Sequence, residues 1–172
     1  NVADDHPEVV AQLRKALEVN QRKNDARQRR YVIGAEQNPV TFSPDDWIEA
    51  KLSYYQIEIR NGVMGFAPIL ADVAQAGTYR FELRRWPSET GGTIRGVLAD
   101  EATERMAGKK LDIVRASLQV RDFDASLAVD DTMTVATFDV DLEAGPIDIA
   151  ARFTTAGGEE TGAYYLTVRL LK

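Results

Sequence analysis

Cysteine is absent from the 172 residues, and histidine occurs once. The first absence excludes disulfide frameworks, thiolate zinc sites and cysteine nucleophiles, and it leaves the redox compartment undetermined. One histidine without a second histidine or a cysteine cannot build the usual transition-metal site. His6 stands between Asp5 and Pro7, and a proline there is typical of a helix start, so we interpret His6 as part of a capping segment rather than a general base.

Long apolar runs and phosphate-binding or hydrolytic motifs are missing as well. Because no run of about 18 apolar residues occurs and no basic region precedes an apolar one at the N-terminus, we expect neither a membrane span nor a signal peptide. Glycine-rich phosphate loops, His-Glu-x-x-His and Gly-x-Ser-x-Gly do not occur. The 27 acidic residues against 21 Lys and Arg give a formal net charge of -6. This charge repels a polyanion on average, so nucleic acid is not an expected partner.

The N-terminal part of the chain has a helical pattern. Apolar residues recur at three- and four-residue spacing between residues 5 and 20, with Asp5 as a cap and Pro7 in the first turn. The apolar stripe is narrow, so a helix of this length needs a partner surface to cover it. Residues 22–30 carry five basic residues and one acid. We therefore expect residues 1–30 to be a helix and linker, and residues 31–172 to be a separate domain.

The stripe consists of the following residues: Val9, Val10, Leu13 and Leu17.

After residue 31 the apolar period changes to two. The clearest strand is Thr78–Arg85, in which Tyr79, Phe81 and Leu83 share one face. Glycine, proline and aspartate separate such runs at short intervals, and Gly145-Pro146 and Gly157-Gly158 are expected hairpin connections. Roughly seven or eight short strands predict a mainly β, antiparallel two-sheet sandwich that is jelly-roll-like and follows one N-terminal α-helix.

The remaining predicted strands alternate in the same way: Ile57 and Ile59; residues 111–120; residues 136–142; residues 147–153; residues 164–170.

The end of the clearest strand breaks its own alternation. Arg85 falls in phase with the apolar face, and Trp86 falls in phase with the polar face. An inward arginine must be paired or hydrogen-bonded, because an unpaired buried charge costs several kcal/mol. One interpretation is a ligand platform, on which Trp86 stacks on a sugar ring and Arg84 or Arg85 holds an anionic group. The other is a pair of residues that joins two strand ends or a domain interface, and we favour this one.

Acidic pairs offer no defined metal or acid-base site. Asp122 and Asp124 lie two residues apart, and Asp130 and Asp131 are adjacent. Calcium takes several such oxygens, but the twelve-residue glycine-containing loop of a helix-loop-helix calcium site is missing. We therefore interpret the pairs as turn residues and expect no metal site in this chain.

Four blocks of the sequence, taken in order, resemble the C-terminal region of bacterial-type arylsulfatases. Residues 76–89 are the most distinctive and resemble A-G-x-Y-x-x-x-L-R-R-W-P-x-E. Residues 1–13 resemble N-(L/V)-A-x-x-H-P-E-V-V-x-x-L, a passage at the close of the family's catalytic domain. Residues 38–47 are similar to N-P-V-x-L-x-x-x-D-W, and residues 162–168 resemble G-A-Y-Y-V-x-V.

The resemblance implies a parent sulfuric ester hydrolase and a non-catalytic role for this chain. Sulfatases use a formylglycine made from Cys/Ser-x-Pro-x-Arg, with calcium beside it, and Ser43-Pro44-Asp45 lacks that spacing. We therefore expect no catalytic residue and no cofactor here. The chain also lacks an initiator methionine, and we expect it to be an accessory domain of a longer polypeptide that packs on the catalytic domain and lines its substrate cleft. Family members are commonly exported, which suggests a periplasmic or secreted protein.

Two other functions remain open. A carbohydrate-binding module would use Trp86, Tyr54 and Tyr55 as platforms, although fold analogy alone is a weak warrant. A self-association module would pair the helical stripe with another copy of the chain. The candidate contact residues for an interface or a ligand are Arg84, Arg85, Trp86, Tyr54 and Tyr55.

Overall fold

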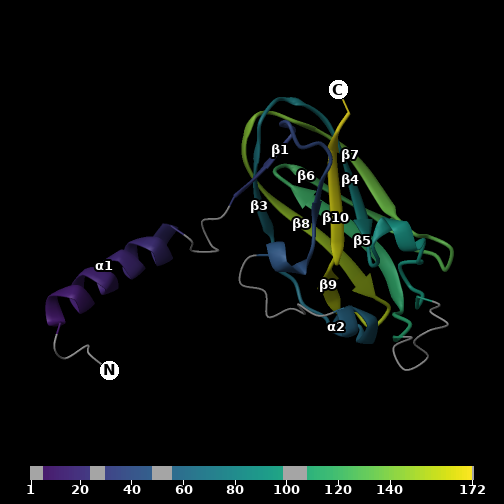
Figure 1. The fold of residues 1–172 in the computed structure, drawn as a ribbon. Coiled ribbons are helices and arrows are strands. Elements are labelled where there is room, and N and C mark those ends of the chain that lie inside the picture. The colour runs from purple at the N-terminus through teal and green to yellow at the C-terminus, as the bar shows by residue number, and fades with distance from the viewer. Residues whose placement is uncertain (1–5, 24–29, 48–55, 99–107, 172) are drawn as a thin grey trace.

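The computed structural model describes residues 6–23, 30–47, 56–98 and 108–171. Within these ranges a helix precedes two packed β-sheets (Figure 1). The prediction of a mainly β, two-sheet sandwich with one N-terminal helix is confirmed. No helix in the described ranges is long and apolar enough to cross a membrane.

Helix α1 spans Pro7–Lys23. Glu8 lies in its first turn, where the negative carboxylate interacts favourably with the positive end of the helix dipole. Figure 1 shows it apart from the sandwich. Three residues of the predicted stripe are exposed: Val9 by 44%, Leu13 by 64% and Leu17 by 55%. No described part of the sandwich covers these side chains.

Among the described residues, ten strands form the sandwich. Sheet A has the order β1 (Tyr31–Ile33), β3 (Ile69–Val73), β8 (Gly145–Thr155), β5 (Ile113–Val120) and β6 (Phe123–Ala128), and β9 (Glu160–Gly162) also pairs with β8. Sheet B has the order β2 (Val40–Phe42), β10 (Tyr165–Leu170), β4 (Gly77–Arg84) and β7 (Ala136–Leu142). In the described ranges three short helices lie between strands: η2 (Pro44–Asp46), α2 (Gln56–Asn61) and η3 (Ser88–Thr90).

The strand pairing is nested. β5 pairs with β6, β4 with β7, β3 with β8 and β2 with β10, so the first half of the sandwich pairs with the second half in reverse order. All four pairs are antiparallel. One long hairpin rolled into two four-stranded sheets is the jelly roll, and the predicted jelly-roll-like architecture is therefore present. β1 extends sheet A by pairing in parallel with β3.

The core lies between the two sheets. Tyr79, Phe81 and Leu83 of β4 are fully buried, as their period of two predicts. β7 alternates buried and exposed residues along its whole length, and β8 buries every second residue from Ile147 to Thr155. Sheet A and sheet B thus each present one outer face to solvent.

Two predictions about local structure are wrong. Ile57 and Ile59 lie in helix α2 rather than in a strand, because two apolar residues two positions apart do not distinguish a strand from one helical turn. Gly145-Pro146 is not a hairpin connection, since β7 and β8 belong to different sheets and the chain crosses between them there. Gly157-Gly158 does connect the paired strands β8 and β9.

Candidate functional site

Arg85 and Trp86 directly follow β4 and are buried, with exposed fractions of 0% and 1%. The inward position of Arg85 agrees with its phase in the strand. Trp86, predicted in phase with the polar face, is buried as well because the chain leaves the strand at Arg84. Neither side chain offers a surface to a ligand in this domain.

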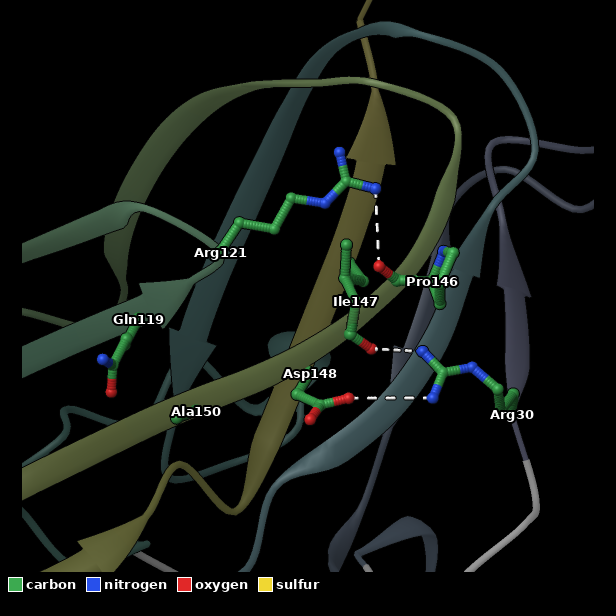
Figure 2. A pocket seen from close by; sticks show the side chains of 7 residues that line it. All are labelled: Arg30, Gln119, Arg121, Pro146, Ile147, Asp148 and Ala150. Carbon is green, nitrogen blue, oxygen red and sulfur yellow. Dashed lines mark hydrogen bonds and ion pairs between the residues drawn. The ribbon is translucent and has the colours of Figure 1, made fainter.

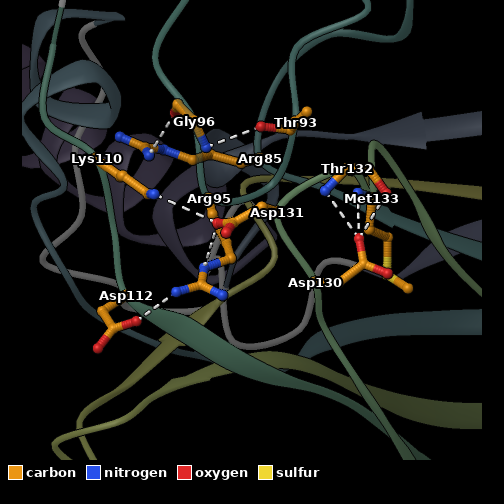
Figure 3. A network of polar contacts seen from close by, with 10 residues as sticks. All are labelled: Arg85, Thr93, Arg95, Gly96, Lys110, Asp112, Asp130, Asp131, Thr132 and Met133. Atoms are coloured by element: carbon orange, nitrogen blue, oxygen red, sulfur yellow. Dashed lines mark hydrogen bonds and ion pairs between the residues drawn. The ribbon is translucent and has the colours of Figure 1, made fainter.

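The Arg85 guanidinium is held by backbone carbonyls of three segments. Its Nη1 donates to the carbonyl of Gly96 at 3.0 Å, and its Nη2 donates to the carbonyls of Ile59 and Arg60 at 3.1 Å and of Lys109 at 2.7 Å. Ile59 and Arg60 lie in the last turn of α2, where helical carbonyls lack intrahelical donors. Arg85 therefore caps α2 and ties it to the segments around Gly96 and Lys109. Figure 3 shows its contact with Gly96.

Trp86 completes this buried cluster. The guanidinium carbon of Arg85 lies 4.5 Å from the centroid of the Trp86 ring, and the indole Nε1 donates to the carbonyl of Thr93 at 3.1 Å. A Cβ at Gly92 would lie 2.6 Å from the indole Cδ1, so only glycine fits beside the ring. The two residues join the end of strand β4 to neighbouring segments, which is one part of the interpretation favoured from the sequence. Both side chains are buried within this domain, so neither is exposed to a ligand or to another domain in the described structure. A contact of this segment with a catalytic domain, the other part of the favoured interpretation, stays a prediction.

Burial shifts the pKa values of two groups in this cluster, Arg85 and Tyr164. Loss of hydration lowers the pKa of Arg85 to about 10, and the nearby Tyr164 partly offsets this effect. Burial raises the pKa of Tyr164, whose hydroxyl donates to the carbonyl of Val63 at 2.9 Å. A cation without a carboxylate partner among the described residues is thus tolerated, because several carbonyl dipoles surround it.

The other predicted contact residues do not join this cluster. Arg84 lies on the outer face of sheet B, and its Nη2 donates to Glu82 at 3.4 Å. Tyr54 and Tyr55 lie outside the described residues. The predicted contact residues therefore form no common surface in the parts of the chain that the structure describes.

The acidic pair at residues 130–131 has a structural role. One Asp130 carboxylate oxygen accepts from the backbone nitrogens of Thr132 and Met133 at 2.8 and 2.9 Å and from the Thr132 hydroxyl at 2.7 Å. The hydrogen bond from the Thr132 hydroxyl lowers the pKa of Asp130 most strongly. Asp131 lies 3.3 Å from Arg95 and from Lys110 (Figure 3). The turn interpretation of this pair is confirmed.

A solvent-open hollow of about 410 Å³ lies on the outer face of sheet A. Figure 2 shows it between Arg30, which precedes β1, and Arg121, at the turn between β5 and β6. Its floor and walls come from the following residues: Gln119, Pro146, Ile147, Asp148 and Ala150. No pattern in the sequence indicated these side chains as a ligand site, and Pro146 was predicted only as a turn residue.

Arg30 anchors one side of the hollow. Its Nε donates to Asp72 at 2.8 Å, its Nη2 donates to the carbonyls of Ala71 and Ile147 at 2.7 and 2.8 Å, and its Nη1 lies 3.7 Å from Asp148. The residue predicted to end the linker is therefore fixed on the sandwich. The only signal for this in the sequence was its position next to β1.

Arg121 stands on the other side of the hollow. It has a φ of 50°, in the left-handed region that tight turns require, and it occupies the two-residue connection between β5 and β6. Its Nη2 lies 3.5 Å from the carbonyl oxygen of Ala144 and 3.4 Å from that of Pro146. These distances are at the long limit for a hydrogen bond, so the guanidinium tip is loosely held.

Comparisons with known proteins place the chain in no family. No protein-family model matches it, and no curated protein matches it. One similar solved structure is the crystal structure of a ruminal GH26 endo-beta-1,4-mannanase, with 20% identity and a TM-score of 0.41. The match covers 84% of this chain and 27% of that chain, so this chain spans about a quarter of the mannanase chain. At this TM-score the likeness carries no argument about function.

Proposed function

We propose that this chain is a non-catalytic accessory domain that packs on a catalytic domain of the same polypeptide through helix α1. The observation that carries the proposal is the exposed apolar stripe of α1, which includes Leu13 and Leu17. The parent is an arylsulfatase in this proposal, on the strength of the four sequence blocks described above. Block 1–13 overlaps the start of α1, and this overlap supports a place for the stripe at the junction with the catalytic domain.

The physical reason for docking is the free energy gained when the apolar side chains of the stripe are removed from water. Full burial of one valine or leucine side chain stabilises a structure by about 1.5–3 kcal/mol. α1 has only 17 residues, and a helix of about this length is marginal in water without tertiary contacts. A catalytic domain that covers Val9, Leu13 and Leu17 would supply these contacts and fix the sandwich beside it.

Hydrogen exchange in the full-length polypeptide and in this chain alone tests the docking. We expect the amides of α1 to be strongly protected only in the full-length polypeptide, and a Leu13→Gln/Leu17→Gln variant to lose this protection. Lys15→Gln is the control, because Lys15 lies on the side of the helix opposite Leu13. Equal exchange of α1 in both contexts would contradict the proposal. Protection that rises with the concentration of this chain alone would instead indicate self-association.

Hydrolysis of an aryl sulfate by this chain alone tests the non-catalytic role. We expect no turnover above the buffer rate, since the sequence lacks a Cys/Ser-x-Pro-x-Arg motif. Turnover that co-purifies with the chain and is lost on its unfolding would refute the proposal.

A second candidate function is carbohydrate binding. The hollow on the outer face of sheet A favours it, because open concave sites with a few polar groups are typical of ligand sites. Calorimetric titration of the whole chain with charged and uncharged oligosaccharides tests this candidate. Tryptophan fluorescence is a poor readout here, since Trp86 and Trp47 are both buried.

A further inference from the structure

The hollow on sheet A has a defined construction. Gln119 of β5 pairs in register with Ala150 of β8, and both side chains point to the outer face. Ala150 ends at its Cβ, so it leaves a low floor beside the longer side chains of Gln119, Asp148 and Arg121. Figure 2 shows these polar side chains around the floor. The hollow is therefore a consequence of one small residue among long ones on a regular sheet.

The polar groups around the floor differ in how fully they are paired. Arg30 is balanced by Asp72 and Asp148. Arg121 has no ion pair within the described ranges and makes only two long contacts to carbonyls. The Gln119 carboxamide makes no hydrogen bond to any described group. A ligand could thus engage Arg121 and Gln119 without breaking a strong contact.

We propose that this hollow binds one ring of an acidic saccharide, with its oxyanion on Arg121 and its hydroxyls on Gln119 and Asp148. A guanidinium fork matches a carboxylate or a sulfate, and both share this chemistry. Gln119 can donate to and accept from a hydroxyl, whereas the Asp148 carboxylate accepts from one. The apolar ring of Pro146 lines the same hollow on the side of Arg30. The site rests on the carbohydrate-binding candidate and is independent of the docking of α1.

Charge limits the ligand further. The chain has a formal net charge of -6, which disfavours a densely charged polyanion. One cation without a carboxylate partner within the described ranges suits a saccharide with a single oxyanion per ring. A short oligosaccharide therefore fits the site better than a long polyelectrolyte.

Isothermal calorimetry on the full chain tests the site with three probes. These are trigalacturonate for a carboxylate, a singly sulfated galactose oligosaccharide for a sulfate, and cellotriose without charge. We expect at least one acidic probe to bind about tenfold more tightly than cellotriose, because of the charge-assisted hydrogen bonds from Arg121. The better acidic probe identifies which oxyanion the hollow accepts. Cellotriose binding as tightly as both acidic probes would overturn the assignment of Arg121.

Variants locate the binding in the hollow. We expect Arg121→Gln to abolish the preference for the acidic probe, and Gln119→Ala and Asp148→Asn each to weaken binding by about fivefold or more. Arg169→Gln is the matched control, since Arg169 is exposed on β10 in the other sheet and the variant removes the same charge. Thermal unfolding confirms that each variant is folded. Binding that is unchanged in all three hollow variants would refute the site but keep the carbohydrate-binding candidate, whereas no binding of any probe would refute both.

Discussion

At the scale of single residues, Arg85 is the charged residue that is fully buried in the described part of the chain. Its guanidinium reaches carbonyls that are 11 to 26 positions away in the sequence and lies against the Trp86 ring. The alternation of β4 predicted that this arginine points inward. The carbonyls that accept from it could not be predicted, because their position depends on how α2 and the segments around Gly96 and Lys109 fold back onto the end of β4.

Replacement of Arg85 by methionine is expected to lower the free energy of unfolding by about 2–4 kcal/mol. Methionine fills much of the space but leaves the carbonyls of Ile59, Gly96 and Lys109 without this donor. Urea unfolding measures the change. Arg84→Met is the control, since Arg84 lies on the outer face and we expect a loss of no more than about 1 kcal/mol. Equal losses in the two variants would contradict the capping role of Arg85.

Tyr164 is expected to make the domain less stable at alkaline pH. Burial raises its pKa above the ordinary value of 10.0, so above that pH the native state keeps a proton that the unfolded state loses. The unfolded state then binds fewer protons, and the free energy of unfolding falls as the pH rises. Urea unfolding from about pH 8 to about pH 11 measures this slope.

Tyr164→Phe serves as the control for the alkaline loss. The lowered pKa of Arg85 acts in the opposite direction, because its folded form releases a proton that the unfolded form retains. Both proteins contain Arg85, so the difference between their slopes reports Tyr164. We expect the phenylalanine variant to lose less stability above pH 10 than the parent, and identical slopes would contradict the role of Tyr164.

At the scale of elements, α1 exposes Val9, Leu13 and Leu17, whereas most strands bury every second residue against the core. The spacing of Val10, Leu13 and Leu17 predicted the helix, and the structure has it over Pro7–Lys23. The same local rule failed for Ile57 and Ile59, where α2 forms instead of a strand. A helix of four turns repeats its pattern often enough to be recognised, whereas six residues do not.

The exposed stripe predicts that α1 contributes little to the stability of the isolated sandwich. Leu13→Gln/Leu17→Gln should change the free energy of unfolding by less than about 0.5 kcal/mol, because both leucines already face solvent. Leu118 of β5 is buried in the core, and Leu118→Ala should lower the free energy of unfolding by about 2–5 kcal/mol. Chemical denaturation followed by near-ultraviolet circular dichroism compares them. A large loss in the double variant would show that α1 packs on the sandwich in solution.

At the scale of the whole molecule, the jelly roll depends on pairing between distant parts of the chain. β10 lies between β2 and β4 in sheet B, and Leu166 of β10 pairs with Phe42 of β2 and with Leu83 of β4. Bringing such distant segments together costs loop-closure entropy before the strands make contacts that offset the cost. This order of events is typical of slowly folding all-β proteins. We therefore expect β10 to be essential for folding although it has only six residues.

Deletion of residues 165–172 is expected to prevent folding. β2 and β4 would then lack their shared partner, and the core would lose Leu166 and Val168. Deletion of residues 1–23, which removes more chain, should shift Tm by no more than about 2 °C. Thermal unfolding followed by circular dichroism decides between these outcomes. A folded protein without β10, or an unfolded one without α1, would contradict the architecture.

The sequence by itself determined the α1 pattern, the two-faced strands and the inward phase of Arg85, because these depend on spacing within a few residues. It also excluded thiolate chemistry, since no cysteine is present. Only the tertiary structure decided which carbonyls surround Arg85 and that Arg30, Gln119, Arg121 and Asp148 share one hollow. The physical reason is that these groups come from strands and turns far apart in the chain, and sheet pairing alone sets their register and their distance.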